Sequence, residues 1–217
     1  MKQNKPAAGI LFLSLFLLSS CLGIDADIVL NSNGSGTIAL EYRISKSLDS
    51  LGKLDGNERW NTIPVGKADF ERTMDRLPEM KLLSFSSKED EKNRIISAKM
   101  EFASLRGLLA FLDASGRRST LSGDARSGHI ILTLNEGRKN TDADFNRLLA
   151  DICEGYSVKL GMSFPGEGSL TVSDGQGKPL AVIPGSEIQA RGKRVSCSFP
   201  LYEILFSTAG LNAEFSW

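Results

Sequence analysis

Three stretches of this sequence place an apolar side chain at every second residue, and this pattern limits what the chain can fold into. They are residues 37–44, 94–102 and 158–164. Because successive side chains of a β-strand point to opposite faces of a sheet, such alternation predicts half-buried strands. Strands of this kind need other elements to cover their apolar face.

Turn residues separate neighbouring predicted strands. Asn33-Gly34 lies between residues 28–30 and 37–44, and this dipeptide favours the tight turn of a β-hairpin. Asn31 and Asn33 before Gly34 also resemble part of a calcium-binding loop. The aspartate that opens such a loop and the glutamate that closes it are missing, which favours the turn. The charged segment 88–93 separates strand 82–87 from strand 94–102. Its acidic residues 89–91 are interpreted as a solvated hairpin tip in preference to a cation site.

The second half of the chain also alternates short strands with turns. Further strands are expected at 128–135, 170–173, 180–183, 194–199 and 211–217, with a helical turn at 201–207.

Apolar residues at helical spacing predict three helices. Phe70, Met74 and Leu77 mark a short one, and Ser104 is the expected N-cap of another, which carries Leu105, Leu108, Leu109 and Leu112. Thr141 to Asp144 form a capping box before the longest apolar stripe, and Gly155 follows as a stop. The stripe consists of Phe145, Leu148, Leu149, Ile152 and Cys153. The predicted fold is a single α+β domain, a largely antiparallel sheet of hairpins packed against a few amphipathic helices.

The N-terminus has the pattern of a secretory signal. Lys2 and Lys5 precede the apolar run 7–18, which is shorter than the roughly 20 residues that span a bilayer. The run ends in Leu18-Ser19-Ser20-Cys21, which resembles a bacterial lipobox: an aliphatic residue, two small residues and a cysteine. The resemblance implies a diacylglycerol on the Cys21 thiol, cleavage before Cys21 and acylation of the new amino group. The alternative is an ordinary signal followed by a bystander cysteine.

The lipobox interpretation predicts the organisation of the chain and its location. Residues 1–20 are the lipoprotein signal peptide, 21–27 are the lipidated cysteine and a short tether, and 28–217 are one domain. In this family an aspartate after the cysteine favours the inner membrane of many Gram-negative bacteria. Leu22 stands there instead, which slightly favours the outer membrane of the bacterial cell envelope.

Charge and hydropathy limit the classes of partner that the mature chain is expected to bind. Loss of Lys2 and Lys5 leaves 24 basic and 26 acidic residues, a formal charge of −2, which argues against binding to nucleic acid. No second apolar run approaches 18 residues, so only the lipid is expected to enter the bilayer.

No residue set indicates a catalytic activity, a cofactor or a metal. His129 is the only histidine and has no nucleophile motif near it, so a structural or surface role is expected. Ser50 and Lys53 match the S-x-x-K of penicillin-recognising enzymes, but the companion S-D-N and K-T-G elements are absent. Gly34-Ser-Gly36 and Gly175-Gln-Gly177 lack the spacing of a dinucleotide loop. The protein is therefore expected not to be an enzyme.

The helix predicted after the capping box and the strand 158–164 suggest a hypothetical apolar pocket for a lipid or another apolar envelope molecule. Its residues are Phe145, Leu149, Ile152, Val158, Leu160, Met162 and Phe164. The alternative is a closed core, because a helix packed on a sheet buries the same stripe. Cys153 and Cys197 remain after lipidation, and the sequence leaves open whether they form a disulfide.

Several of these segments together resemble the LppM-like domains of bacterial envelope lipoproteins. They are the early hairpin, the helix-containing middle, Tyr156 to Gly166, Ser198 to Ile204 and Trp217. The resemblance implies an antiparallel sheet wrapped against helices and, in the mycobacterial branch, an apolar cavity that engages lipids. That branch carries a C-terminal membrane helix, whereas this chain stops at Trp217. We expect a non-enzymatic, membrane-anchored lipoprotein that binds an apolar molecule or, alternatively, presents a surface to an envelope protein.

Overall fold

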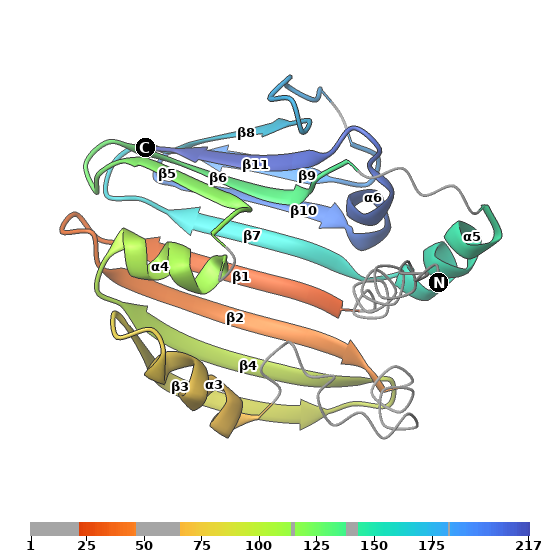
Figure 1. Cartoon of the computed structure of the whole chain (residues 1–217), viewed down its shortest axis with the longest axis horizontal. Coiled ribbons are helices and arrows are strands. Elements are labelled where there is room, and N and C mark those ends of the chain that lie inside the picture. The colour runs from red at the N-terminus through yellow and green to blue at the C-terminus, as the bar shows by residue number, and fades with distance from the viewer. Residues whose placement is uncertain (1–21, 47–65, 114–115, 138–142, 182) are drawn as a thin grey trace, which may run out of the picture.

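A computed structural model of the chain describes residues 22–46, 66–113, 116–137, 143–181 and 183–217. Within them the chain has a mixed α+β fold dominated by strands, which form two sheets (Figure 1). The side chains of six of these residues lie outside the description: Leu22, Ala143, Phe145, Leu148, Leu149 and Ile152.

The elements have the following bounds. The larger sheet contains β1 (Leu22–Leu30), β2 (Gly36–Ser45), β3 (Met80–Glu89), β4 (Asn93–Phe102), β7 (Ser157–Ser163), β9 (Glu187–Arg191) and β10 (Arg194–Pro200). The smaller sheet contains β5 (Ser119–Gly123), β6 (Gly128–Asn135), β8 (Ser169–Ser173) and β11 (Leu211–Ser216). The helices are α3 (Lys67–Asp75), α4 (Leu105–Leu112), α5 (Ala143–Cys153) and α6 (Leu201–Phe206).

The larger sheet has β1 at its centre, in the order β3-β4-β2-β1-β7-β10-β9. β1 pairs antiparallel with β2, as the hairpin prediction requires, and Gly34 takes the positive φ of 86° in the turn between them. On its other side β1 pairs in parallel with β7, with Ile24 opposite Val158. Strands distant in the sequence therefore meet at the middle of the sheet.

The alternation in the sequence is confirmed by burial. Ile38, Leu40 and Tyr42 of β2 are buried, as are Ile96, Ala98, Met100 and Phe102 of β4. Their neighbours on the opposite face include Arg43 and Lys99, which are exposed. The larger sheet thus has an apolar inner face and a polar outer face.

Helices α3 and α4 and the smaller sheet contribute to the core on the inner face of the larger sheet. Phe70 of α3 lies between Tyr42 and Phe85, with ring centroids 6.3 and 5.6 Å away. Ser104 caps α4 as predicted, accepting a hydrogen bond from the Gly107 N–H at 3.1 Å. From the smaller sheet come the buried residues Ile130, Val172, Leu211, Ala213 and Phe215, which join the same cluster.

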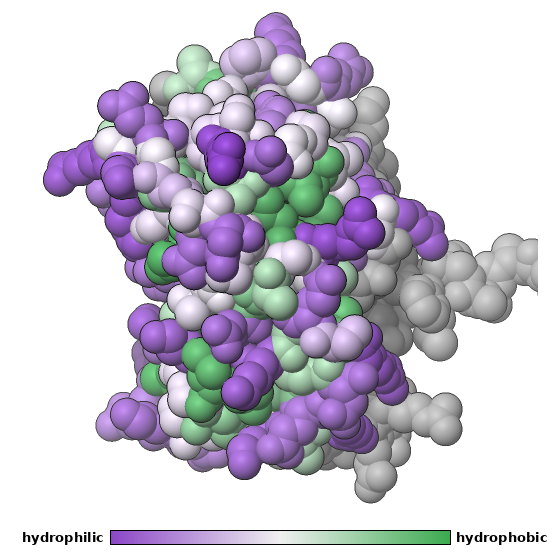
Figure 2. Space-filling view, turned by 90° about the vertical axis from the view of Figure 1, so that its left-hand side faces the viewer, coloured by the Kyte–Doolittle hydropathy of each residue, from purple (hydrophilic) through white to green (hydrophobic). Residues whose placement is uncertain are grey.

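In the order of the described elements, the chain crosses between the two sheets five times: through α4, through α5, after β7, after β8 and through α6. After β7, the Phe164 ring stacks on that of Trp217 with centroids 5.1 Å apart. The last crossing, through α6, leads from β10 to β11. Figure 2 looks at the end of the molecule at which β1 finishes, where hydrophobic residues appear as patches between hydrophilic ones.

Some predicted boundaries are wrong. Residues 22–27, expected as a tether, belong to β1, because they pair with β2 and, from Ile24 on, also with β7. Of residues 180–183, expected as a strand, the described ones (Leu180, Ala181 and Ile183) belong to no strand: Pro179 forms an isolated bridge with Ser173, and Pro184 follows closely. Proline has no N–H for a ladder hydrogen bond.

Two strands of the structure, β5 and β9, were not predicted. Both lie at a sheet edge, and every residue of β9 is exposed. A strand at a sheet edge that buries little on either face does not need alternating apolar residues, so the sequence pattern does not predict it.

Candidate functional site

The predicted lipid attachment residue, Cys21, lies outside the described residues, but the structure shows where its neighbour is. Leu22 begins β1, the central strand, and pairs with Ile44 near the end of β2. We call this end of the larger sheet the proximal end. It carries Leu22, Lys46, the turn 90–92, Tyr156 and Leu201. The opposite end, at the turn 31–35 between β1 and β2, is the distal end.

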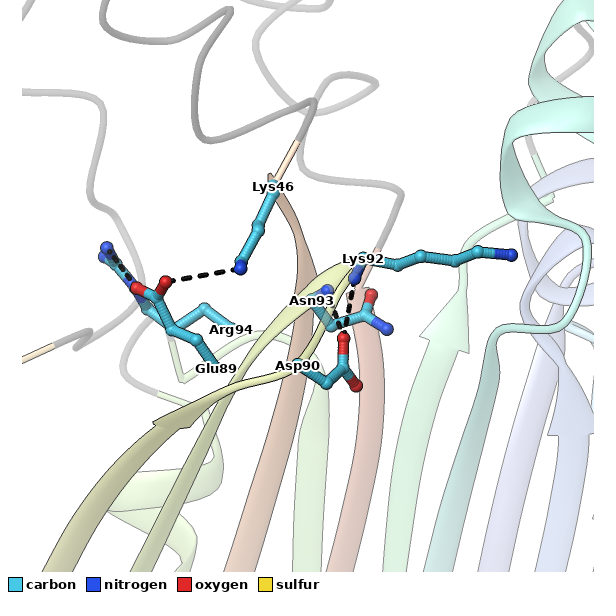
Figure 3. A network of polar contacts seen from close by, with 6 residues as sticks. All are labelled: Lys46, Glu89, Asp90, Lys92, Asn93 and Arg94. Atoms are coloured by element: carbon cyan, nitrogen blue, oxygen red, sulfur yellow. Dashed lines mark hydrogen bonds and ion pairs between the residues drawn. The ribbon is translucent and has the colours of Figure 1, made fainter.

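A polar network holds the proximal end together on the β3–β4 side (Figure 3). Glu89 accepts from Lys46 Nζ at 3.3 Å and from Arg94 Nη2 at 3.2 Å. The hydrogen bond from Lys46, followed by that from Arg94, holds the pKa of the Glu89 carboxyl below its ordinary value. This network ties the end of β2 to both strands of the neighbouring hairpin.

The turn itself is closed by the Asp90 carboxylate. Its Oδ1 atom accepts from the backbone N–H groups of Asn93 at 2.6 Å and Lys92 at 2.8 Å. These bonds, that from Asn93 first, lower the pKa of Asp90. The carboxylates of Glu89 and Asp90 therefore engage donors of their own chain, which supports the hairpin-tip interpretation of residues 89–91.

Tyr156 connects this hairpin to β7 across the two strands between them. Its hydroxyl donates to Asn93 Oδ1 at 2.7 Å. The ring passes beside Gly23 of β1, where an added Cβ would lie 3.6 Å from Tyr156 Cδ1. The Tyr156 carbonyl also accepts from the N–H of Leu201 at 2.9 Å, which fixes the start of α6 at the proximal end. Tyr156 thus connects the starts of β1, β4, β7 and α6, which are four separate segments of the chain.

The hypothetical apolar pocket is described only on its strand side. Val158, Leu160, Met162 and Phe164 are all buried and belong to the common core. The side chains of Phe145, Leu149 and Ile152 lie outside the described residues, as does the predicted capping residue Thr141. The helix itself forms as expected and contacts α6.

Two open hollows lie on the outer face of the larger sheet and meet at Asp25 and Asp27 of β1. One, of about 220 Å³, extends over β7, β10 and β9, and the other, of about 370 Å³, over β2, β4 and β3. Small and charged side chains line them, including Gly161, Ser196, Ala39 and Ser97. Sequence reasoning missed this face, because residues that alternate with core residues carry no signal beyond exposure.

His129 lies on the outer face of the smaller sheet beside Glu214, with Nε2 and Oε2 3.6 Å apart. The Ser173 hydroxyl also donates to Glu214, so the carboxylate stands between the hydroxyl and the imidazole. A hydroxyl nucleophile needs a hydrogen bond to its base, which here would be His129. Ser173 is moreover fully buried. These contacts join Glu214 to residues 85 and 41 positions earlier in the sequence, so no local pattern could have indicated them.

Both cysteines of the described chain are buried, and no disulfide joins Cys153 to Cys197. Burial raises the pKa of the Cys197 thiol to about 12. Among the described residues, His, Cys, Asp and Glu side chains form no group of three that could hold a metal ion. In the same part of the chain, every helix is too short or too polar to cross a membrane.

Comparisons of the chain with protein-family models, with curated proteins and with solved structures found no match.

Proposed function

We propose that this protein is a bacterial envelope lipoprotein, attached to the membrane through acyl chains on Cys21 and without catalytic activity of its own. One observation carries the proposal: the lipobox pattern Leu18-Ser19-Ser20-Cys21 after a charged and apolar leader. The first strand begins at the next residue, so the folded domain starts where the signal would be cut. Two or three acyl chains anchor stably, whereas one holds only marginally. Leu22 slightly favours the outer membrane.

The absence of catalysis is supported by the surroundings of His129. It lies beside a carboxylate that already accepts from the Ser173 hydroxyl, so Ser173 and His129 are not paired as a nucleophile and its base. A broad activity screen of the mature domain is the test. A reproducible activity that disappears on replacing one polar residue, with the fold intact, would overturn this part of the proposal.

The proposal uses the finer form of the fold, a largely antiparallel sheet of hairpins packed against a few amphipathic helices, as in LppM-like domains. Within it, two roles are open to the anchored domain. The first is binding of a lipid or other apolar molecule between α5 and β7. The second is a protein-interaction surface with no ligand pocket, and the burial of Val158, Leu160, Met162 and Phe164 in the common core favours it. Native mass spectrometry of the acyl-free domain separates them, because co-purified lipid supports the pocket.

Metabolic labelling with a palmitate analogue in a bacterial host tests the anchor. The parent chain should incorporate the label and fractionate with membranes, and Cys21→Ala should lose both properties. Ser20→Ala is the matched control, because it keeps a small residue at that lipobox position and should still be labelled. Persistent labelling of the Cys21→Ala variant contradicts the proposal.

A further inference from the structure

We infer that the proximal end of the larger sheet rests on the lipid headgroups. In this orientation the strands point away from the membrane surface, and the distal end lies farthest from it. This inference rests on the proposed acylation of Cys21. Its occupant is the headgroup layer of the bilayer that holds the protein's own acyl chains.

The first argument is the length of chain between the anchor and the fold. β1 begins at Leu22, and consecutive Cα atoms lie about 3.8 Å apart, so the acylated residue directly adjoins the central strand. Each headgroup layer is roughly 5–8 Å thick. Because no residue separates Cys21 from β1, the domain cannot move away from the headgroup layer while its acyl chains stay in the membrane.

The second argument is that β1 cannot lengthen the connection by peeling from the sheet. It pairs on both sides from its first residues, with β2 from Leu22 on and with β7 from Ile24 on. Tyr156 crosses beside Gly23 to reach Asn93 of β4, which adds a contact across β1 and β2. The start of β1 is therefore held by its neighbours, and the direction of the strand sets the direction of the domain.

The third argument is the chemistry of the proximal surface. Tyr202 of α6 is one of the exposed large hydrophobic side chains, 42% exposed, and its ring lies 6.0 Å from that of Phe206. The bond from Leu201 to Tyr156 places this helix at the proximal end. Tyrosine rings favour the headgroup region, where an apolar ring and a polar hydroxyl are both accommodated. Lys92 is exposed on the turn between β3 and β4, on the other side of β1, and extends away from Glu89 (Figure 3).

Site-directed labels at the two ends test the orientation. Glu91→Cys places a thiol on the exposed proximal turn, and Ser32→Cys places one on the exposed distal turn. Because Cys153 and Cys197 are buried and Cys21 is acylated, a maleimide fluorophore should react at the introduced thiol only. The acylated full-length product is reconstituted in phosphatidylcholine vesicles that contain a headgroup spin-labelled lipid. We expect the Glu91→Cys label to be quenched several-fold more strongly than the Ser32→Cys label.

A linker variant separates this inference from the anchor itself. Ten Gly and Ser residues inserted between Cys21 and Leu22 add roughly 16–19 Å of mean reach, so the difference in quenching should disappear while the protein stays acylated. Equal quenching at both ends without the linker, in protein that is acylated, overturns the orientation and leaves the proposed function standing. Absence of acylation overturns both.

Discussion

Arg194 on β10 reaches Asp27 on β1 across the full width of β7. Its Nη1 atom lies 2.8 Å from Asp27 Oδ1, and it also donates to Ser163 Oγ at 3.3 Å. The side chains pass over Gly161, where an added Cβ would lie 2.9 Å from Asp27 Oδ1 and 3.2 Å from Arg194 Nη2. The absence of a side chain on β7 thus makes room for a contact between strands that are not neighbours.

Gly161→Ala should displace this ion pair at little cost to stability. The two side chains are half-exposed, and such pairs contribute about 0–1 kcal/mol, so the free energy of unfolding should fall by about 1 kcal/mol at most. Urea denaturation of the acyl-free mature chain measures it.

Gly36→Ala is the contrasting variant. Its Cβ would lie 2.0 Å from the Val29 carbonyl oxygen and 2.4 Å from Phe102 Cζ, which are backbone and core atoms that cannot swing aside. Overpacking of this kind costs about 1–3 kcal/mol. Equal losses in the two variants would contradict the distinction between a flexible and a fixed neighbour.

Val158→Phe should destabilise the domain by about 1–3 kcal/mol, because Val158 is buried in the core opposite Phe199 of β10. Leu160→Ala removes volume from the same face and should cost about 2–5 kcal/mol. Thermal melts combined with titration of an apolar fluorescent probe give the measurement. A Val158→Phe domain that melts like the parent, together with probe binding by the parent that the variant loses, would establish the open pocket and reject the closed core.

Asp90→Asn should weaken the proximal turn in a pH-dependent way. Backbone N–H donors lower the pKa of the folded carboxyl, so its contribution is present above the unfolded value of about 3.9 and is lost as pH falls through the lower folded pKa. The difference in melting temperature between parent and variant should therefore be larger at pH 6 than at pH 3. Glu91→Gln, which removes a charge from the same turn, is the control. A parent–Asp90→Asn difference that persists unchanged at pH 3 would speak against the carboxylate as its cause.

The two thiols of the acylated protein should react slowly with a thiol reagent at pH 8 and completely in denaturant. Burial keeps the reagent away from both, and a pKa of about 12 leaves very little Cys197 thiolate. The time course of reaction with a chromogenic disulfide reagent gives the rates. Ser32→Cys supplies an exposed thiol for comparison, and reaction of the parent as fast as that of this variant would disprove the burial.

Local patterns in the sequence were sufficient for many of the elements. The alternation in residues 37–44 and 94–102 and the turn at Asn33-Gly34 predicted β2, β4 and the first hairpin, and Ser104 predicted the start of α4. These features depend on side-chain period, turn chemistry and capping, all of which act between residues close in the chain. The predicted anchor at Cys21 is of the same kind, because a targeting motif is a contiguous string.

The tertiary structure alone decided how these elements meet. Nothing in residues 22–27 distinguishes a tether from a strand, since they become β1 only through pairing with β2 and with the distant β7. The same pairing brings Asp27 within reach of Arg194, and the antiparallel partners of β11 bring His129 and Ser173 to Glu214. Burial of a shared apolar face selects these partners, and that selection depends on all the strands together rather than on any one segment of the chain.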